Sequence, residues 1–185
     1  MKLKTLAWTT AATVATAAAG GVATDPDSSW YLKLRKPDWQ PPAIAFPVVW
    51  TALYADLAVT SAVALDRAVA LDRAARLDRA VGLERAAGRA STGGKDSRRE
   101  LRAYRSALAA NLVLNASWSW FFWRSRTPWL AAAEAALLAA SSADLVRRTY
   151  RLNRGAGVSL APYAAWCGFA TALSTAIAGL NSAKP

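Results

Sequence analysis

Residues 30–54, WYLKLRKPDWQPPAIAFPVVWTALY, decide how this chain folds, because they join a proline-rich loop to an apolar segment. The stretch holds three tryptophans, two tyrosines, four prolines and three basic residues. Proline lacks a backbone donor and disfavours helix in the residue before it, so we predict an ordered, non-helical connection over 31–40 and a helix from Pro42 or shortly after. Tryptophan and tyrosine gather at membrane interfaces. The stretch therefore predicts a loop that closes over a membrane helix.

The charges of the chain gather in one segment. Residues 66–105 hold eleven of the 23 basic and six of the 12 acidic residues, so the rest is more apolar than the average composition suggests. The net charge of +11 fits the excess of Lys and Arg on the cytoplasmic side of membrane proteins better than a nucleic-acid surface, since no basic face with interleaved aromatic residues is found. With one cysteine, Cys167, and no histidine, the sequence excludes an intramolecular disulfide, a cysteine-based zinc site and histidine-dependent catalysis.

Five segments are long and apolar enough, at about 20 residues each, to cross a ~30 Å hydrocarbon core. They cover approximately residues 5–24, 42–65, 104–123, 128–147 and 157–181. We therefore predict an all-α fold, a five-helix transmembrane bundle in which residues 1–185 form one domain. The first segment also resembles a cleavable signal peptide, with a basic start and small residues near its end. The spans that follow it favour an uncleaved helix.

A hydrophilic insertion, approximately residues 66–103, interrupts the apolar segments. It overlaps four related hexads, LDRAVA, LDRAAR, LDRAVG and LERAAG, which begin at Leu65, Leu71, Leu77 and Leu83. A step of six residues turns successive leucines onto three faces of a helix, so the repeat is not a coiled-coil seam. The pair of Asp72 and Arg76 supports a solvated helical extension, which GRASTGGK at 88–95 should break. Its role is open between contact with anionic lipid or a partner protein and a duplicated loop of no consequence.

The distribution of basic residues predicts one orientation in the membrane. The N-terminus and the connections after the second and fourth spans hold 17 Lys and Arg residues, against six in the other three connections. The first set should be cytoplasmic, which places the C-terminus and the 25–41 loop outside. We therefore predict an integral protein of a bacterial cell membrane with a cytoplasmic N-terminus.

Three spans carry aromatic and polar side chains along one helix face. The stripes are Phe46, Trp50, Leu53 and Leu57; Asn111, Asn115, Trp118 and Phe122; and Tyr163, Trp166, Ala170, Ser174 and Ile177. Such a face either packs against another helix, with amides bonded across the contact, or walls a cavity for a flat hydrophobic ligand. Two carboxylates within spans, Asp56 and Glu134, are open to a proton or transport role, to pairing with a helix neighbour, or to exposure at the membrane interface.

Four motifs follow one another along the chain: WYxxLxKPxWxPP at 30–42, FPxVWTxLY at 46–54, LVLNASWSWFF at 112–122 and PYxxWxxFAxxL at 162–173. Together they resemble the translocator protein, or tryptophan-rich sensory protein, family (TspO/MBR), and cover nearly the whole chain outside the hexads. The resemblance implies five transmembrane helices, a ligand cavity beneath the 25–41 loop, and binding of porphyrin. Some members also bind cholesterol and synthetic ligands.

The resemblance and the stripes place one set of residues around that cavity. Its members are Tyr31, Pro42, Phe46, Trp50, Asn111, Asn115, Trp118, Phe122, Trp166 and Ala170. Porphyrin-degrading members depend on the two tryptophans matched by Trp50 and Trp166, which are therefore the candidate catalytic residues. Lys33, Arg35 and Lys36 either meet the porphyrin propionates or anchor the loop among lipid headgroups.

Three functions remain open from the sequence. The chain is a sensor or receptor for protoporphyrin or a similar flat ligand that regulates tetrapyrrole or stress handling, a light- and oxygen-dependent porphyrin-degrading enzyme, or a transporter. None requires a cofactor or metal, and the expected partners are the hydrophobic ligand, the lipid bilayer and a second copy of the chain, not nucleic acid. Ser174 stands where the family often has asparagine, and residues 173–181 lack the tyrosine and basic residue of the cholesterol pattern.

Overall fold

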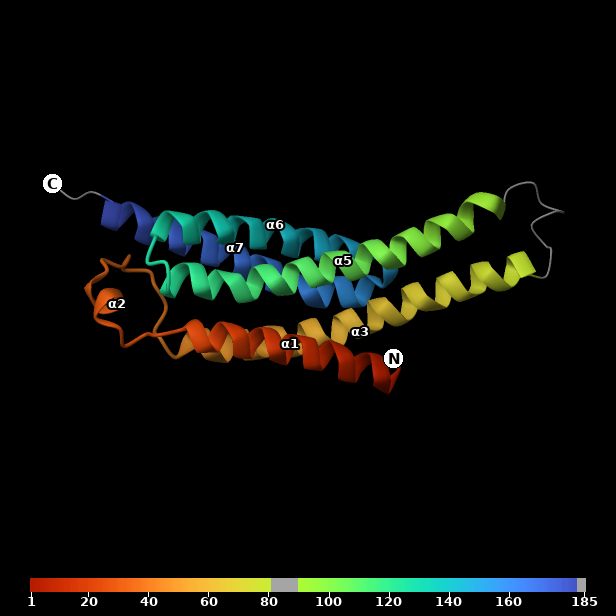
Figure 1. The fold of residues 1–185 in the computed structure, drawn as a ribbon, viewed down its shortest axis with the longest axis horizontal. Coiled ribbons are helices and arrows are strands. Elements are labelled where there is room, and N and C mark those ends of the chain that lie inside the picture. Colours follow the sequence, from red (N-terminus) through yellow and green to blue (C-terminus); the bar gives the residue numbers. More distant parts are fainter. Residues whose placement is uncertain (81–89, 183–185) are drawn as a thin grey trace.

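The computed structural model describes residues 1–80 and 90–182, and all regular structure in these residues is helical. The helices are α1 (Leu3–Ala23), α2 (Ser29–Lys33), α3 (Ala45–Ala80), α5 (Ala90–Trp123), α6 (Pro128–Leu152) and α7 (Arg154–Ser182). The five long helices lie side by side in one bundle, and the short α2 belongs to the loop at one end (Figure 1). The predicted all-α bundle of five long helices is confirmed.

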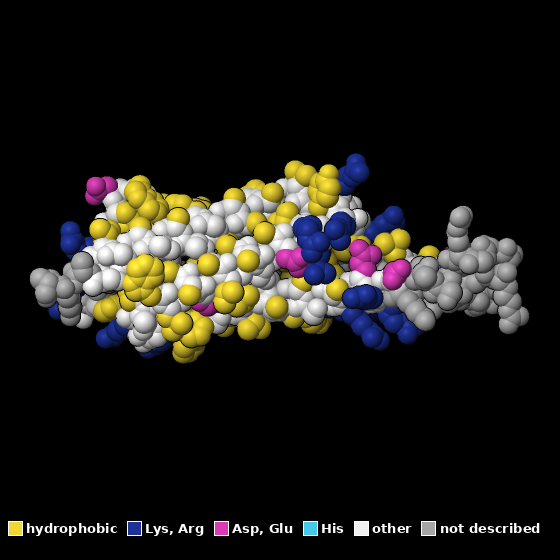
Figure 2. Space-filling model, turned by 90° about the horizontal axis from the view of Figure 1, so that it is seen from above, with side chains coloured by type: hydrophobic (Ala, Val, Ile, Leu, Met, Phe, Trp, Pro, Cys, Tyr) yellow, Lys and Arg dark blue, Asp and Glu magenta, His cyan; other side chains and the backbone are white. Residues whose placement is uncertain are grey.

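Four of the described helices, α1, α3, α6 and α7, are long and apolar enough to cross a membrane. Helix α5, which has Asn111 and Asn115 within its apolar part, is not among them, but it packs against α1, α3 and α6 within the same bundle. Hydrophobic side chains are spread along the flank of the bundle, and basic side chains gather toward its ends (Figure 2). Side chains such as Trp8, Val22 and Val113 are largely exposed. A flank of this kind suits a hydrocarbon surrounding.

Close packing of large and small side chains holds the helices together. Leu57, Leu145 and Leu160, from three different helices, are completely buried. On α1 the contact face is built from small residues, and a Cβ added at Gly20 would lie 3.1 Å from Ser119 Oγ on α5. Since lipid is as apolar as leucine, such close approach, rather than exclusion of water, is what holds membrane helices together.

The two ends of the bundle carry different parts of the chain. Asp66, in the first hexad, accepts a hydrogen bond from the Lys2 backbone N–H and one from Thr5 Oγ1 at 2.6 Å, which ties the start of α1 to α3. The 25–41 loop and the end of α7 lie at the opposite end (Figure 1). The N-terminus and the hexad part of α3 thus share one end, as the charge count requires. That this end faces the cytoplasm stays a prediction.

The prediction that 31–40 is a non-helical connection is wrong over residues 31–33, because α2 extends into it. Ser28 caps this helix, and its hydroxyl oxygen accepts a hydrogen bond from the Tyr31 N–H at 3.4 Å. Pro37 restricts only the residues next to it, so it leaves Ser29–Lys33 free to coil. Helix α3 begins at Ala45, shortly after Pro42 as predicted.

The hexads continue α3 without interruption as far as Ala80, and Arg76 Nη2 lies 2.7 Å from Asp72 Oδ2, as expected of a solvated extension. The break predicted over 88–95 is wrong from Ala90 onwards, where α5 begins and passes through two glycines. A helical glycine costs about 1 kcal/mol, which is small beside the packing of a helix of 34 residues. The hexad that begins at Leu83 lies outside the described residues.

Candidate functional site

The lid, residues 25–41, is fixed to the end of α7 by one side chain. The Asn181 amide accepts a hydrogen bond from the Arg35 N–H at 3.0 Å, and its Nδ2 donates to the Arg35 carbonyl oxygen at 2.9 Å. Within the lid, Gln40 Nε2 donates to the Tyr31 hydroxyl at 3.4 Å, and Lys36 Nζ lies 4.0 Å from the centre of the Tyr31 ring. The lid therefore has a defined conformation and a defined anchor.

Below the lid, aromatic rings from the lid and from α5 form what we call the lid cluster: Trp30, Tyr31, Trp118, Phe122 and Trp123. Its centre is the buried Phe122, whose ring centroid lies 5.6 Å from that of Trp30 and 6.2 Å from that of Tyr31. Trp118 stacks on Phe122 with centroids 5.5 Å apart. The α5 stripe predicted from the sequence thus meets the predicted lid.

A second set of rings, the wall cluster, joins α3 to α7: Phe46, Trp50, Tyr163, Trp166 and Phe169. Trp166 is its centre, stacked on Phe169 at 5.0 Å and in edge contact with Phe46 at 6.0 Å and Trp50 at 6.5 Å. Phe46 and Phe169 of the wall cluster pack on the same buried apolar side chains as the lid cluster, among them Leu173 and Ile177 of α7. Trp50 and Trp166 pack on the neighbouring core that contains Tyr163. The lid and the stripes of α3, α5 and α7 therefore converge on one region.

The two asparagines of α5 are engaged in contacts between helices. Tyr54 donates to Asn115 Oδ1, Asn115 Nδ2 donates to the Tyr163 hydroxyl at 2.9 Å, and that hydroxyl donates to Asn111 Oδ1 at 2.7 Å. Asn111 Nδ2 then donates to Ser142 Oγ at 3.0 Å. This chain of bonds links α3, α5, α7 and α6. Asn111 and Asn115 thus bond across helices, the first of the two interpretations that the sequence left open.

Two indoles of the clusters have no partner for their N–H group. The Nε1 atoms of Trp118 and Trp166 are inaccessible to solvent and make no hydrogen bond in the part of the chain that the structure describes. By contrast, Trp120 Nε1 donates to the Ala19 carbonyl at 3.1 Å and Trp129 Nε1 to Ser182 Oγ at 2.5 Å. A buried donor without a partner costs about 1–3 kcal/mol, so Trp118 and Trp166 are the donors with most to gain from a ligand.

Two of the predicted site residues, Pro42 and Ala170, lie outside both ring clusters. Pro42 is exposed ahead of α3, and Ala170 is half-buried one turn beyond Trp166; neither belongs to a ring cluster. The sequence did not single out Tyr54 or Ser142, which complete the bonds of the asparagines. The hydroxyl-bearing Ser142 in a hydrophobic helix was the available signal, but its partner could be found only from the packing of α5 on α6.

The two carboxylates within the helices pair with neighbouring helices. Asp56 Oδ1 accepts from Ser159 Oγ at 2.6 Å, and Glu134 Oε1 accepts from Ser117 Oγ at 2.9 Å. Their second oxygens have no hydrogen-bond donor among the described residues. The described residues contain no group of three acidic, His or Cys side chains that could hold a metal ion. Among the described residues, the site offers aromatic faces and N–H donors to a ligand.

The chain is similar to known proteins over nearly the whole bundle. The sequence model of the TspO/MBR family matches residues 7–180. The tryptophan-rich protein TspO of Chlorobaculum tepidum is 28% identical over 164 residues, which are 88% of this chain and 87% of that protein. An uncharacterised membrane protein, YtaB, of Bacillus subtilis is 27% identical over 155 residues, 84% of this chain and 82% of its own. The tryptophan-rich protein TspO of Bacillus cereus is 23% identical over a stretch of the same length.

Proposed function

The chain belongs to the TspO/MBR family of membrane proteins, and from this premise we propose that it is a receptor for porphyrin or a similar flat hydrophobic ligand, bound beneath the lid. The observation that carries the proposal is the pair of buried indole N–H groups, that of Trp118 in the lid cluster and that of Trp166 in the wall cluster. Flat rings stack on indoles, and polar atoms at the edge of the ligand accept hydrogen bonds from the two N–H groups.

The charge of the lid suits a ligand with acidic arms. Lys33 and Arg35 are exposed on the lid, and the Lys36 ammonium lies over the Tyr31 ring, close to the lid cluster. Porphyrin propionates placed at this mouth would meet three cationic side chains while the macrocycle lies among the rings. Occupation of the site then stabilises the closed lid, which is the change that a sensor can transmit.

Titration in the dark tests the receptor. Protoporphyrin added to the purified protein in detergent should quench tryptophan fluorescence, and Trp118→Phe and Trp166→Phe should each weaken binding about fivefold, because each removes one N–H donor worth about 1 kcal/mol. The matched controls are Trp120→Phe and Trp129→Phe, whose indoles are exposed and bonded elsewhere. Equal loss in all four variants would place the ligand outside the two clusters.

A second candidate, light-dependent porphyrin breakdown, is favoured by the contact between Trp50 and Trp166, whose ring centroids are 6.5 Å apart. An indole can donate an electron to a photoexcited porphyrin, with dioxygen as the oxidant, and a neighbouring indole can share the resulting radical. Illumination of the complex in air should then bleach the Soret band, and Trp50→Phe should bind porphyrin in the dark but bleach it more slowly. If porphyrin binds but the protein does not speed its bleaching, the enzyme function fails and the receptor function stands.

A further inference from the structure

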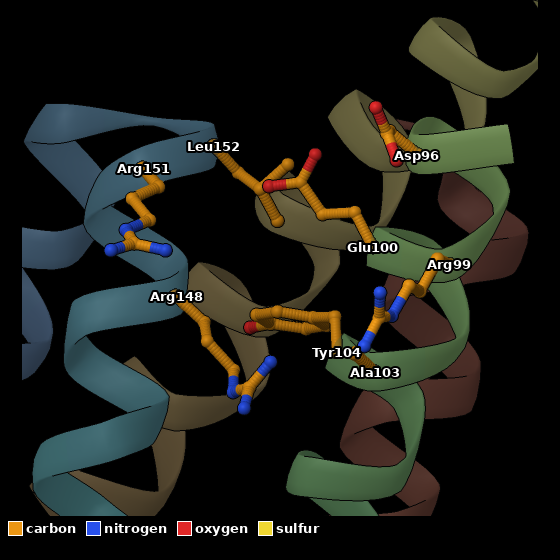
Figure 3. A pocket seen from close by; sticks show the side chains of 8 residues that line it. All are labelled: Asp96, Arg99, Glu100, Ala103, Tyr104, Arg148, Arg151 and Leu152. Atoms are coloured by element: carbon orange, nitrogen blue, oxygen red, sulfur yellow. The ribbon is translucent and has the colours of Figure 1, made fainter. Parts of the chain in front are cut away.

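A cavity of about 300 Å³ lies at the end of the bundle opposite the lid, between α5 and α6. Three guanidinium groups line it, those of Arg99, Arg148 and Arg151, together with the carboxylates of Asp96 and Glu100 (Figure 3). Arg99 comes from α5 and Arg148 from α6, and both reach the space beside the same tyrosine ring (Figure 3). The cavity is therefore flanked by charges of both signs.

Most of these charges have no ion-pair partner among the described residues. Arg148 Nε donates to Asp144 Oδ2 at 2.5 Å. In the described residues, however, neither Arg99 nor Arg151 has a carboxylate within 4.0 Å, and the carboxylates of Asp96 and Glu100 likewise have no cation within that distance. Two cations and two anions that face one cavity without pairing leave room for a group that carries both charges.

The base of the cavity is apolar. Tyr104 is 1% exposed, and its hydroxyl is already hydrogen-bonded to Thr149 Oγ1 at 3.1 Å, so the ring rather than the hydroxyl faces the space. Ala103 and the buried Leu152 complete this surface. The volume equals about ten waters at ~30 Å³ each, which accommodates a small headgroup but not a large ring system.

The position of the cavity matches the headgroup layer. Arg148 and Arg151 follow directly after the apolar part of α6, at the same end of the bundle as the N-terminus (Figure 1). Guanidinium groups bind phosphate through two parallel hydrogen bonds, and carboxylates accept hydrogen bonds from a primary ammonium. A phosphate alone would be repelled by Asp96 and Glu100, and a quaternary ammonium has no N–H to donate to them.

We propose that this cavity binds a phosphoethanolamine group, with the phosphate held by the arginines that line the cavity and the ammonium by Asp96 and Glu100. The source is either the headgroup of phosphatidylethanolamine or a free phosphoethanolamine. The site is independent of the lid region and of the porphyrin proposal.

Native mass spectrometry of the full-length protein with lipids of matched acyl chains tests the site. Phosphatidylethanolamine should be retained about tenfold more than phosphatidylglycerol or phosphatidylcholine, because only the first offers both charge-assisted contacts. Arg99→Gln with Arg151→Gln should abolish this preference. Asp96→Asn with Glu100→Gln should also abolish it, while retention of phosphatidylglycerol rises. Arg124→Gln with Arg126→Gln, at the lid end, is the control and should change nothing.

Unchanged helix content by circular dichroism and an unchanged unfolding transition in mixed micelles with increasing SDS show that each variant is folded. Competition with soluble phosphoethanolamine distinguishes the two sources: displacement of the lipid at millimolar concentration assigns the site to a free zwitterion, and no displacement assigns it to the lipid. Equal retention of the three lipids, or a preference that survives both double variants, would overturn the proposal.

Discussion

At the scale of single residues, the site separates polar groups that are already bonded from polar groups that are not. Asn115 uses its carbonyl for Tyr54 and its amide for Tyr163, whereas Trp118, one turn further along α5, has a buried N–H without a partner in the described chain. Side chains on one stripe of one helix thus serve different purposes. Asn115 connects helices, and Trp118 is available to a ligand.

Asn115→Ala should lower the free energy of unfolding by about 1–2 kcal/mol, because it removes two hydrogen bonds between membrane helices, each worth about 0.6 kcal/mol on average and up to about 1.7. Unfolding in mixed micelles with increasing SDS measures this. Ser106→Ala is the control, since Ser106 is exposed and bonds only to its own helix at Ala103. A variant of native stability with strongly weakened porphyrin binding would instead make Asn115 a ligand contact.

The sequence predicted which face of α5 these residues share, but not which residues of other helices they contact. Helical spacing put Asn111, Asn115 and Trp118 on one face, and the structure has all three facing the interior of the bundle. Which of them is bonded depends on Tyr54 and Ser142, which belong to other helices. No spacing within α5 contains that information.

At the scale of elements, the turn from α6 to α7 depends on one glycine. A Cβ added at Gly157 would lie 2.4 Å from Tyr150 Cα and 2.6 Å from Tyr150 N, so two backbones approach each other where no side chain fits. Gly157→Ala should therefore lower the free energy of unfolding by about 1–3 kcal/mol through overpacking. The same SDS titration checks it.

Gly168→Ala is the matched control in the same helix, because a Cβ at Gly168 meets nothing within 4 Å. That variant should be neutral or stabilised by up to about 1 kcal/mol, as alanine favours helix over glycine. Equal effects of the two substitutions would show that the close approach at Tyr150 has no energetic weight.

The lid, as an element, has its anchor in Asn181, so this residue should set how fast a ligand enters and leaves. Asn181→Ala removes both hydrogen bonds to the Arg35 backbone, each worth about 1 kcal/mol, and should raise the association and dissociation rates of protoporphyrin about tenfold while the dissociation constant changes little. Stopped-flow quenching of tryptophan fluorescence in the dark measures both rates.

Thr175→Ala is the control for the lid, since Thr175 is exposed on α7 and its hydroxyl bonds only to Thr171 of the same helix. If Asn181→Ala leaves both rates unchanged but the ligand still binds, the lid is not the route of entry. If protoporphyrin does not bind the unaltered protein at all, the receptor proposal fails rather than the role of Asn181.

The helix boundaries show where the local effects of proline, glycine and capping residues were enough to predict the structure. Pro128 lies at the first turn of α6 as predicted, because a proline there loses no hydrogen bond. The short α2 was missed, because the prediction used only the prolines at 37, 41 and 42, and the helix is capped by Ser28, ahead of the residues that these prolines restrict. Helix α5 runs through glycines that local rules treat as a break, since the propensity of two residues is small beside a helix of 34 residues.

At the scale of the whole molecule, the positions of the two ends make the orientation testable. The hexad part of α3 and the N-terminus share one end, and the lid lies at the other (Figure 1). The lid end carries Lys33, Arg35, Lys36, Arg124 and Arg126, and the other end carries most of the remaining basic residues. The positive-inside rule counts basic residues and takes no account of contacts. The bundle geometry adds which connections lie on the same side of the membrane.

We expect the lid end to be outside the cell and the hexad end in the cytoplasm. In a Cys167→Ala background, which removes the buried thiol, Asp27→Cys in the lid should react with a membrane-impermeant maleimide on intact cells. Asp78→Cys, exposed on the α3 extension, should react only after the cells are permeabilised. The asymmetry follows from the excess of basic residues at the hexad end, because Lys and Arg in connections near membrane spans resist translocation.

Labelling of Asp78→Cys but not Asp27→Cys on intact cells would show the opposite orientation. It would also place the proposed phosphoethanolamine cavity in the outer leaflet while leaving its charges and its lipid preference unchanged, so the two proposals can fail separately.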